Sequence, residues 1–521
     1  MKNKFTFLPL LIFAFISPPP FGSEAIELSP GSKSQSFKIY DSREISTQYF
    51  SLKLSEISLD NVLPPKDYSH KAVGGGVISR IEGTHNILHI DAYGNSTLID
   101  IASQKLQKDF FPPLDTGAQY LQYSKFYTLI ETSPRVLGVV NSGDVIYVSY
   151  NYYDRVSDKI YFCVSQISFK NPKWVEIYRT PPIDVPYFTL GNGGKLAIHD
   201  DKLFFTIGDQ SLDRANGLPS DFAPQNWEMP WGKTLYFVLN KFPVKPVICS
   251  VGHRNPQGLL ITSSGTIYET EHGPRGGDEL NVIKCGGNYG WPNVSYGTSY
   301  WSYGSSFPPK LNTFYDKLLN FFKSEYVEPI YFFTPSPALT SLIQINNFSN
   351  EWDGDLLLGS LKATSLYRVK LADAIHVKNI EQINLNSRVR DMVQIDGQIV
   401  LLTDGGTILL LSKSDSPLFS GPVYPALNGC LGCHVLKSNS KNPFAPSLSN
   451  VYGANLGSSD YEYSASFLLH KNIIWNDENL RLFLQNPQKF IPGTKMPAMY
   501  YKPDYIVDVI KELKLLKSNQ K

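Results

Sequence analysis

A short cysteine–histidine motif near the C-terminal end constrains this chain more than any other feature. Residues 430–434 read Cys-Leu-Gly-Cys-His. Cys430 and Cys433 lie on one face of a helical turn, where both thiols can form thioethers with the vinyl groups of one porphyrin, and His434 then lies under the iron. A zinc site is the alternative, but it would need two more Cys or His ligands, and only His470 is available in this segment. The motif therefore predicts covalently attached haem c.

A methionine downstream of the motif provides the second axial ligand of the expected iron. Met496 lies in residues 492–497, Pro-Gly-Thr-Lys-Met-Pro, and Met499 is the alternative ligand. This segment resembles the sixth-ligand loop of class I cytochromes c, and residues 445–448, Ala-Pro-Ser-Leu, resemble the loop that follows their haem motif. Thioether ligation favours ferrous iron and raises the reduction potential, which suits an electron acceptor.

Helix signals accompany the haem motif. Asn476 is a good N-cap for a helix that contains Leu480, Leu482 and Phe483, and residues 503–516 place apolar side chains at helical spacing. A Ser/Pro-rich linker precedes the motif near residue 413. The C-terminal hundred or so residues are therefore expected to form a small all-α cytochrome c domain.

Short strands and tight turns fill residues 70–412. We expect strands at 144–150, 159–169, 195–198, 202–207 and 234–239, where β-branched and aromatic residues gather between turn sequences. Because so many strands would otherwise leave exposed sheet edges, the pattern favours a closed β-propeller over sandwich domains in series. Residues 211–231 and 296–326 break this rhythm, as functional lids or simple decorations do.

The composition agrees with a folded, turn-rich protein. Hydrophobic residues make up 42% and aromatic residues 13% of the chain, with 38 Gly and 36 Pro. The formal net charge is +1, which excludes a global field that would hold nucleic acid or an anionic membrane surface.

The N-terminal residues predict export. A basic start precedes an apolar run over 5–16, three prolines, and small residues suited to a signal peptidase at 23–25. An uncleaved anchor is the alternative, although the run is shorter than the ~20 apolar residues of a membrane span. In the periplasm or outside the cell, Cys249 and Cys285 can form a disulfide that leaves Cys163 unpaired, and three buried reduced thiols are the alternative.

Three phrases in the β region are dense in Gly, Arg, carboxamide and carboxylate groups. They are Gly-His-Arg-Asn-Pro-Gln-Gly-Leu at 252–259, Glu-His-Gly-Pro-Arg-Gly-Gly-Asp-Glu-Leu-Asn at 271–281, and Gly-Asn-Tyr-Gly-Trp-Pro at 287–292. Such loops can bring carbonyls and a cation to an anionic ligand, or they can lock neighbouring blades together. Together they resemble the glucose/sorbosone dehydrogenase family, the six-bladed propellers that bind pyrroloquinoline quinone (PQQ) with calcium.

The resemblance implies a set of cofactor residues. Residues expected to contact the quinone are Arg254, Asn255, Lys362, Arg388, Arg390 and, by a looser alignment, Phe332 and Thr334. The backbone carbonyls of Gly273 and Pro274 are expected to ligate Ca²⁺. Several cations facing a tricarboxylated cofactor make electrostatic sense.

The resemblance breaks at the general base. The family's histidine position holds Gly191, while its supporting carboxylate is retained as Asp209, a candidate base in its own right. The pocket glutamine is also replaced, with Ser133 and Pro134 near that point. Losing a general base costs about 10² to 10⁴ in rate. His199, His253 and His272 are the other imidazoles to consider as substitutes.

Two functions are consistent with these features. The first is an exported oxidoreductase that oxidises a sugar or alcohol at a PQQ site and passes electrons to its own haem, and from there to another cytochrome or oxidase. The second is a degenerate propeller that binds a ligand or partner, beside a separate electron carrier. The expected divisions are a signal peptide (1–25), an N-terminal extension (26–69), the propeller (70–412), a linker (413–425) and the cytochrome c domain (426–521).

Overall fold

The structure is a computed structural model of the 521-residue chain. It describes residues 34–58, 75–117, 135–184, 191–210, 223–239, 245–274, 276–297, 326–414, 425–427, 430, 434, 436, 445–459, 461–494, 496 and 503–518. The expected signal peptide, Cys433, Met499, Ser133 and Pro134 lie outside these residues, as do 211–222 and 298–325 from the two irregular stretches.

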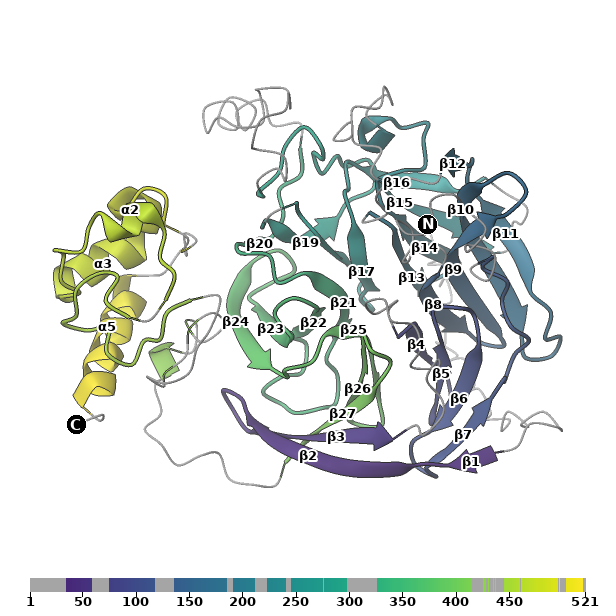
Figure 1. Cartoon of the computed structure of the whole chain (residues 1–521), viewed down its shortest axis with the longest axis horizontal. Coiled ribbons are helices and arrows are strands. Elements are labelled where there is room, and N and C mark those ends of the chain that lie inside the picture. The colour runs from purple at the N-terminus through teal and green to yellow at the C-terminus, as the bar shows by residue number, and fades with distance from the viewer. Residues whose placement is uncertain are drawn as a thin grey trace, which may run out of the picture.

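Six antiparallel sheets surround a common centre in the described residues (Figure 1). The first contains β4 (Val77–Arg80), β5 (Asn86–Ile90), β6 (Ser96–Asp100) and β7 (Lys105–Lys108), with β1 (Ser34–Ser36) at its edge. The second contains β8 (Val136–Ser142), β9 (Val145–Asp154), β10 (Lys159–Ser168) and β11 (Val175–Arg179), with β12 (Ile183–Asp184) paired to β10. The third contains β13 (Gly193–His199), β14 (Lys202–Ile207), β15 (Lys233–Val238) and β16 (Val247–Val251), and a 3-10 turn, η3 (Ala223–Gln225), precedes β15.

The second half of the ring repeats this pattern. The fourth sheet contains β17 (Pro256–Ile261), β18 (Ile267–Glu271), β19 (Asp278–Ile283) and β20 (Tyr331–Phe333). The fifth contains β21 (Leu339–Gln344), β22 (Leu356–Ser360), β23 (Ser365–Leu371) and β24 (Val377–Asn384). The sixth contains β25 (Val389–Ile395), β26 (Gln398–Thr403), β27 (Ile408–Lys413), β3 (Ser51–Ser58) and β2 (Lys38–Ser46).

The sheets form a closed ring. Strands β4, β8, β13, β17, β21 and β25 contact one another in this order, and β25 contacts β4 again. Each sheet therefore presents one inner strand to a central channel, which is the arrangement of a six-bladed propeller. This confirms the predicted fold, and the five strands expected from the sequence coincide with β9, β10, β13, β14 and β15.

The N-terminal strands belong to the propeller. Strand β3 pairs with β27, β2 pairs with β3, and β1 pairs with β7, so the segment expected as a separate extension completes the sixth blade and borders the first. The propeller is therefore larger than the predicted range 70–412. The sixth sheet thus combines strands from the two ends of the propeller, which closes the ring.

Hydrophobic clusters fill the spaces between neighbouring blades. Between the second and third blades, the ring of Phe205 stacks between those of Phe162 and Phe237, with centroid distances of 6.1 and 4.9 Å. The Cys249–Cys285 disulfide joins β16 of the third blade to the turn after β19 of the fourth. This confirms the expected pairing, and Cys163 is a buried free thiol.

A small helical domain follows the propeller. It contains η6 (Pro425–Leu427), α2 (Ala465–Leu468), α3 (Asp477–Gln485), α4 (Pro487–Phe490) and α5 (Pro503–Ser518). As expected, Asn476 caps α3 by accepting a hydrogen bond from the Asn479 amide. The apolar faces of α3 and α5 share one core with Leu427 and Trp475. Within the described ranges, no helix has the length and apolar character of a membrane span.

Candidate functional site

A cavity of about 160 Å³ lies in the helical domain around the predicted haem ligands. Cys430, His434 and Met496 line it, together with mostly apolar side chains such as Phe467 and Leu484. His434 Nδ1 lies 2.7 Å from the Pro446 carbonyl oxygen. Donation by Nδ1–H fixes the tautomer in which Nε2 keeps its lone pair for a metal.

These residues fit a haem. Burial lowers the pKa of His434, which keeps the imidazole neutral, as a metal ligand must be. Met496 packs against the same apolar cluster as Cys430, so a thioether and a thiol face one cavity with the imidazole. Three residues that the sequence predicts as haem ligands or attachment points, Cys430, His434 and Met496, therefore line one cavity suited to a haem. The second thioether position, Cys433, lies outside the described residues.

The cations expected to bind a quinone gather at the ends of the inner strands. Arg388 and Arg390 flank the start of β25 and both bind the Asp404 carboxylate, with Nη2–O distances of 2.9 and 2.6 Å. Arg388 Nη1 also lies 3.4 Å from the carbonyl of Leu361, the residue before Lys362. The side chain of Lys362 is exposed. Two guanidinium groups against one carboxylate leave a net positive charge here.

Arg254 and Asn255 precede β17 of the fourth blade, and Gln257 connects them to this group of the sixth blade. Asn255 Oδ1 accepts from Gln257 Nε2 at 2.8 Å, and Gln257 Oε1 accepts from Arg390 Nη1 at 3.4 Å. Arg254 Nη1 donates to the carbonyls of His272 and Gly273 at 3.1 and 3.0 Å. A continuous set of contacts therefore connects the predicted residues of the fourth and sixth blades.

Arg135, which the sequence analysis did not identify, adds a further cation. With Arg390 and Lys195 it lines a small cavity of about 20 Å³ among the inner strands. Its Nε has no hydrogen-bond partner among the described residues. Burial, with the positive charge of Arg390, lowers the pKa of Arg135 to about 10. Asp404 and Asp391 offset part of this positive charge, and the remainder fits an anionic ligand such as a polycarboxylate.

Phe332 and Thr334 lie at the edge of the fourth blade. The Phe332 ring stacks on Tyr296 with a centroid distance of 4.4 Å. The exposed Thr334 lies beside Gly276, since a Cβ built on that glycine would be 3.4 Å from the Thr334 methyl group. Both residues thus border the loop that contains Gly273 and Pro274.

The expected calcium position fits less well. The Gly273 carbonyl already accepts from Arg254, so a cation bound to that oxygen would face a guanidinium group. We therefore derive no chemical step through calcium.

Asp209 fills the space beside Gly191, the position at which the resemblance implies a missing base. A Cβ on Gly191 would lie 2.0 Å from Asp209 Oδ1, so the carboxylate occupies the space in which a longer side chain would begin. Its other oxygen accepts from Trp291 Nε1 at 2.8 Å, and its backbone amide donates to the Arg254 carbonyl at 2.8 Å. The Arg254 guanidinium lies over the Trp291 ring at 5.4 Å. The acidic group is thus fixed beside the predicted quinone-binding arginine.

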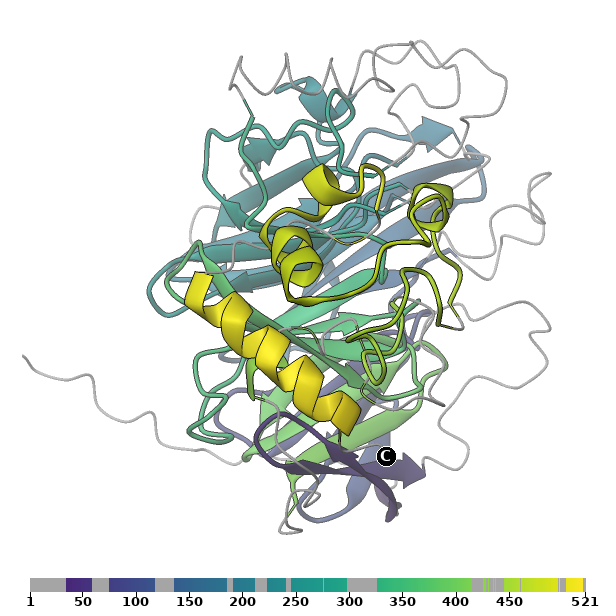
Figure 2. The same cartoon turned by 90° about the vertical axis from the view of Figure 1, so that its left-hand side faces the viewer.

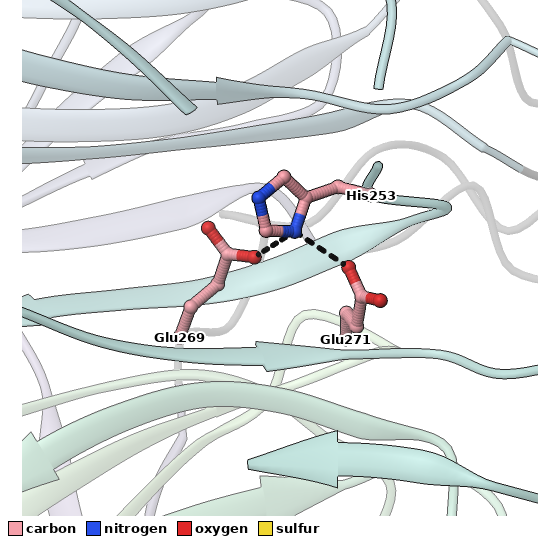
Figure 3. A group of neighbouring side chains, drawn as sticks. All are labelled: His253, Glu269 and Glu271. Atoms are coloured by element: carbon pink, nitrogen blue, oxygen red, sulfur yellow. Dashed lines mark hydrogen bonds and ion pairs between the residues drawn. The ribbon is translucent and has the colours of Figure 1, made fainter. Parts of the chain in front are cut away.

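None of the three imidazoles considered as a replacement base is well placed. His199 lies at the β13–β14 turn beside Asp200, and His272 is engaged by the Leu339 carbonyl. His253 is fully buried between Glu269 and Glu271, with Nδ1–O distances of 2.9 and 3.2 Å (Figure 3).

His253 forms a buried charge cluster with Glu269 and Glu271. Burial alone would lower the pKa of His253, but the two glutamates raise it to about 10, so the ring is an imidazolium ion at neutral pH. Ser250 and Tyr289 hold its other side, the first at 2.8 Å from Nε2 and the second by ring stacking. The three side chains could hold a metal ion by their spacing, but the imidazolium ring already forms ion pairs with both carboxylates, and burial raises the pKa of Glu271.

Comparison with known proteins gives the family. The pattern of the family described as Glucose / Sorbosone dehydrogenase matches residues 139–411, which is more than half of the chain. The chain belongs to this family. Cytochrome c relatives match the C-terminal part of the chain, so a cytochrome c domain is fused to the glucose/sorbosone dehydrogenase propeller.

Individual relatives agree with this division. Aldose sugar dehydrogenase YliI of Escherichia coli is 29% identical over 256 residues, which cover 46% of this chain and 64% of that protein. Quinoprotein glucose dehydrogenase B of Acinetobacter calcoaceticus is 28% identical over 279 residues, 40% of this chain and 58% of that protein. A cytochrome c homolog of Rickettsia typhi is 44% identical over 88 residues, 16% of this chain and 49% of that protein.

A solved structure shares the fold. A glucose dehydrogenase aligns with a TM-score of 0.50 at 21% identity, over 73% of this chain and 100% of its own. The matches span between 39% and 64% of the length of the first three curated relatives.

Proposed function

We propose that the protein is an exported oxidoreductase that oxidises a sugar or related alcohol at a PQQ site in the propeller and reduces its own c-type haem. The observation that carries the proposal is a set of four arginines, Arg135, Arg254, Arg388 and Arg390, at the inner strands of the second, fourth and sixth blades, in a chain that also contains a haem pocket. The names of the relatives, an aldose sugar dehydrogenase and a quinoprotein glucose dehydrogenase, support this substrate class.

Different residues of the chain bind the cofactor and accept the substrate proton. The arginines bind and orient the cofactor carboxylates, and Asn255 supplies an amide beside them. A bound quinone would accept the two electrons of the substrate. Asp209 would take the substrate proton, because it is the carboxylate fixed at the position of the missing base. The disulfide and the expected signal peptide support export to the periplasm or outside the cell, with another cytochrome or oxidase as final acceptor.

The test is reconstitution of the full chain, with haem attached, by PQQ and calcium. Aldoses and simple alcohols are then added under anaerobic conditions while the haem absorbance is followed. We expect reduction only when both the quinone and a substrate are present. Titration of PQQ by calorimetry, with and without calcium, separates binding from turnover.

A second candidate function is a propeller that binds its ligand without turnover. Gly191 favours it, since the imidazole of the family is absent and Asp209 is already bonded to Trp291. Binding of PQQ without haem reduction by any sugar would support this function. Failure to bind PQQ at all would refute the proposed site.

A further inference from the structure

The haem cavity is not closed by the helical domain alone. Six propeller residues complete its wall: Tyr331, Phe333, Thr334, Pro335, Tyr367 and Gln382. They come from β20, the segment after it, and strands β23 and β24, at the junction of the fourth and fifth blades. Figures 1 and 2 both place the helical domain against this side of the ring.

The propeller side of the cavity is an aromatic platform. The Phe333 ring contacts Tyr331 and Tyr367 edge to face, with centroid distances of 4.8 and 5.3 Å. Phe333 and Tyr367 are also part of the hydrophobic cluster between the two blades, which holds the platform rigid. Such a surface is suited to cover an apolar porphyrin edge.

The platform is continuous with the proposed quinone site. The Phe333 carbonyl accepts from the Gly277 amide at 2.8 Å, and Thr334 lies beside Gly276. The same loop contains Gly273, whose carbonyl binds Arg254. One short, hydrogen-bonded segment therefore separates the predicted quinone-binding arginine from the wall of the haem cavity.

We propose that residues 331–335 form a docking platform for the haem domain of the same chain, through which electrons pass directly from the propeller to the iron. The electron-transfer part rests on the proposed function. Oxidation of one alcohol group to a carbonyl leaves two electrons and two protons on the cofactor. Each electron reduces one ferric haem to ferrous haem with release of one proton to solvent. A one-electron acceptor, such as a second ferric cytochrome, reoxidises the haem between the two transfers.

The test compares Tyr331→Glu with Tyr40→Glu in the full-length protein with haem attached. Tyr331 is half-buried against the cavity, whereas Tyr40 is exposed on β2 of the sixth blade, so the two variants make the same change at different places. Gln382→Glu is a second, milder platform variant in case Tyr331→Glu does not fold. Small-angle X-ray scattering reports docking, and stopped-flow absorbance reports haem reduction after sugar is added to the PQQ-loaded protein.

We expect a compact wild-type particle, an enlarged radius of gyration for the platform variants, and at least a tenfold slower haem reduction in them. Reduction of a soluble dye by the propeller and both readouts of Tyr40→Glu should stay at wild-type values. An extended wild-type particle, or platform variants that keep both compactness and the haem reduction rate, would overturn the docking. If wild-type protein reduces neither dye nor haem, the proposed function fails, and scattering alone then decides the docking.

Discussion

Replacing Gly191 by alanine tests how the base position is built. The new Cβ would lie 2.0 Å from Asp209 Oδ1, so the carboxylate must turn away. That movement breaks the 2.8 Å bond from Trp291 and leaves a buried indole N–H without its acceptor. Losing a hydrogen bond to a charged group costs about 1.5–3 kcal/mol.

A second effect of the substitution has the opposite sign. Glycine-to-alanine changes at ordinary backbone angles stabilise a protein by about 0.4–1 kcal/mol, because they restrict the unfolded chain. Gly191 has no positive φ, so this gain applies. The lost hydrogen bond is larger, and we expect Gly191→Ala to lower the free energy of unfolding by about 1–2 kcal/mol.

The assay is urea unfolding followed by circular dichroism at constant haem content. Gly405→Ala is the matched control, since its Cβ would meet only the Thr403 hydroxyl at 3.9 Å, and we expect it to be neutral or slightly stabilising. In combination with Trp291→Phe, the cost of Gly191→Ala should shrink by about 1 kcal/mol or more, because the bond is already absent. Equal stability of Gly191→Ala and Gly405→Ala, or strict additivity with Trp291→Phe, would refute this reasoning.

Four further outcomes are expected. Asp209→Asn should slow sugar oxidation by about 10² or more while PQQ still binds by calorimetry, and an unchanged rate would remove this residue as the base. Changing Cys249 and Cys285 together to alanine should cost about 4 kcal/mol in urea unfolding, from the 36-residue separation of the linked positions, whereas reducing agent should then have no further effect. The pKa of His253 is about 10 in the folded protein, above its usual 6.5, so its stabilising contribution is complete below pH 6.5 and is lost as the pH rises through 10. Between these pH values the urea unfolding midpoint of His253→Gln should therefore depend less on pH than that of the wild type. Arg135→Met should leave the ligand-free propeller as stable or more stable, but should reduce the rise in melting temperature on adding PQQ.

The sequence was sufficient where the signal is local. β-branched and aromatic residues at 144–150 and turn residues between strands predicted the blades, and the cap at Asn476 predicted the start of α3. The role of β3 could not be predicted, because its pairing with β27 joins residues about 350 positions apart and no short-range pattern encodes that register.

The candidate site residues show the same contrast between local sequence signals and long-range packing. The family resemblance implied Arg254, Arg388 and Arg390 as quinone contacts, because the motifs that contain them match the family's residue types and spacing. Arg135 was missed because it follows the altered stretch at 133–134, and only the closed ring shows that it points toward the other inner strands. Only the folded structure shows that Asp209 occupies the space beside Gly191. The sequence indicated a change there only through a glycine at the expected base position together with a retained carboxylate at Asp209.

The charges of the channel bear on whether the propeller still binds a ligand. Arg135 and Arg390 are close enough for the second to lower the pKa of the first, and Asp404 is already shared by Arg390 and Arg388. Like charges held together with burial lower the stability of the ligand-free protein. A propeller that had lost its ligand would gain stability by replacing Arg135 with an apolar residue of similar length. Asp404 offsets part of this cost and a bound anion would offset more of it, so the position of Arg135 supports the proposal that the propeller holds a polycarboxylate.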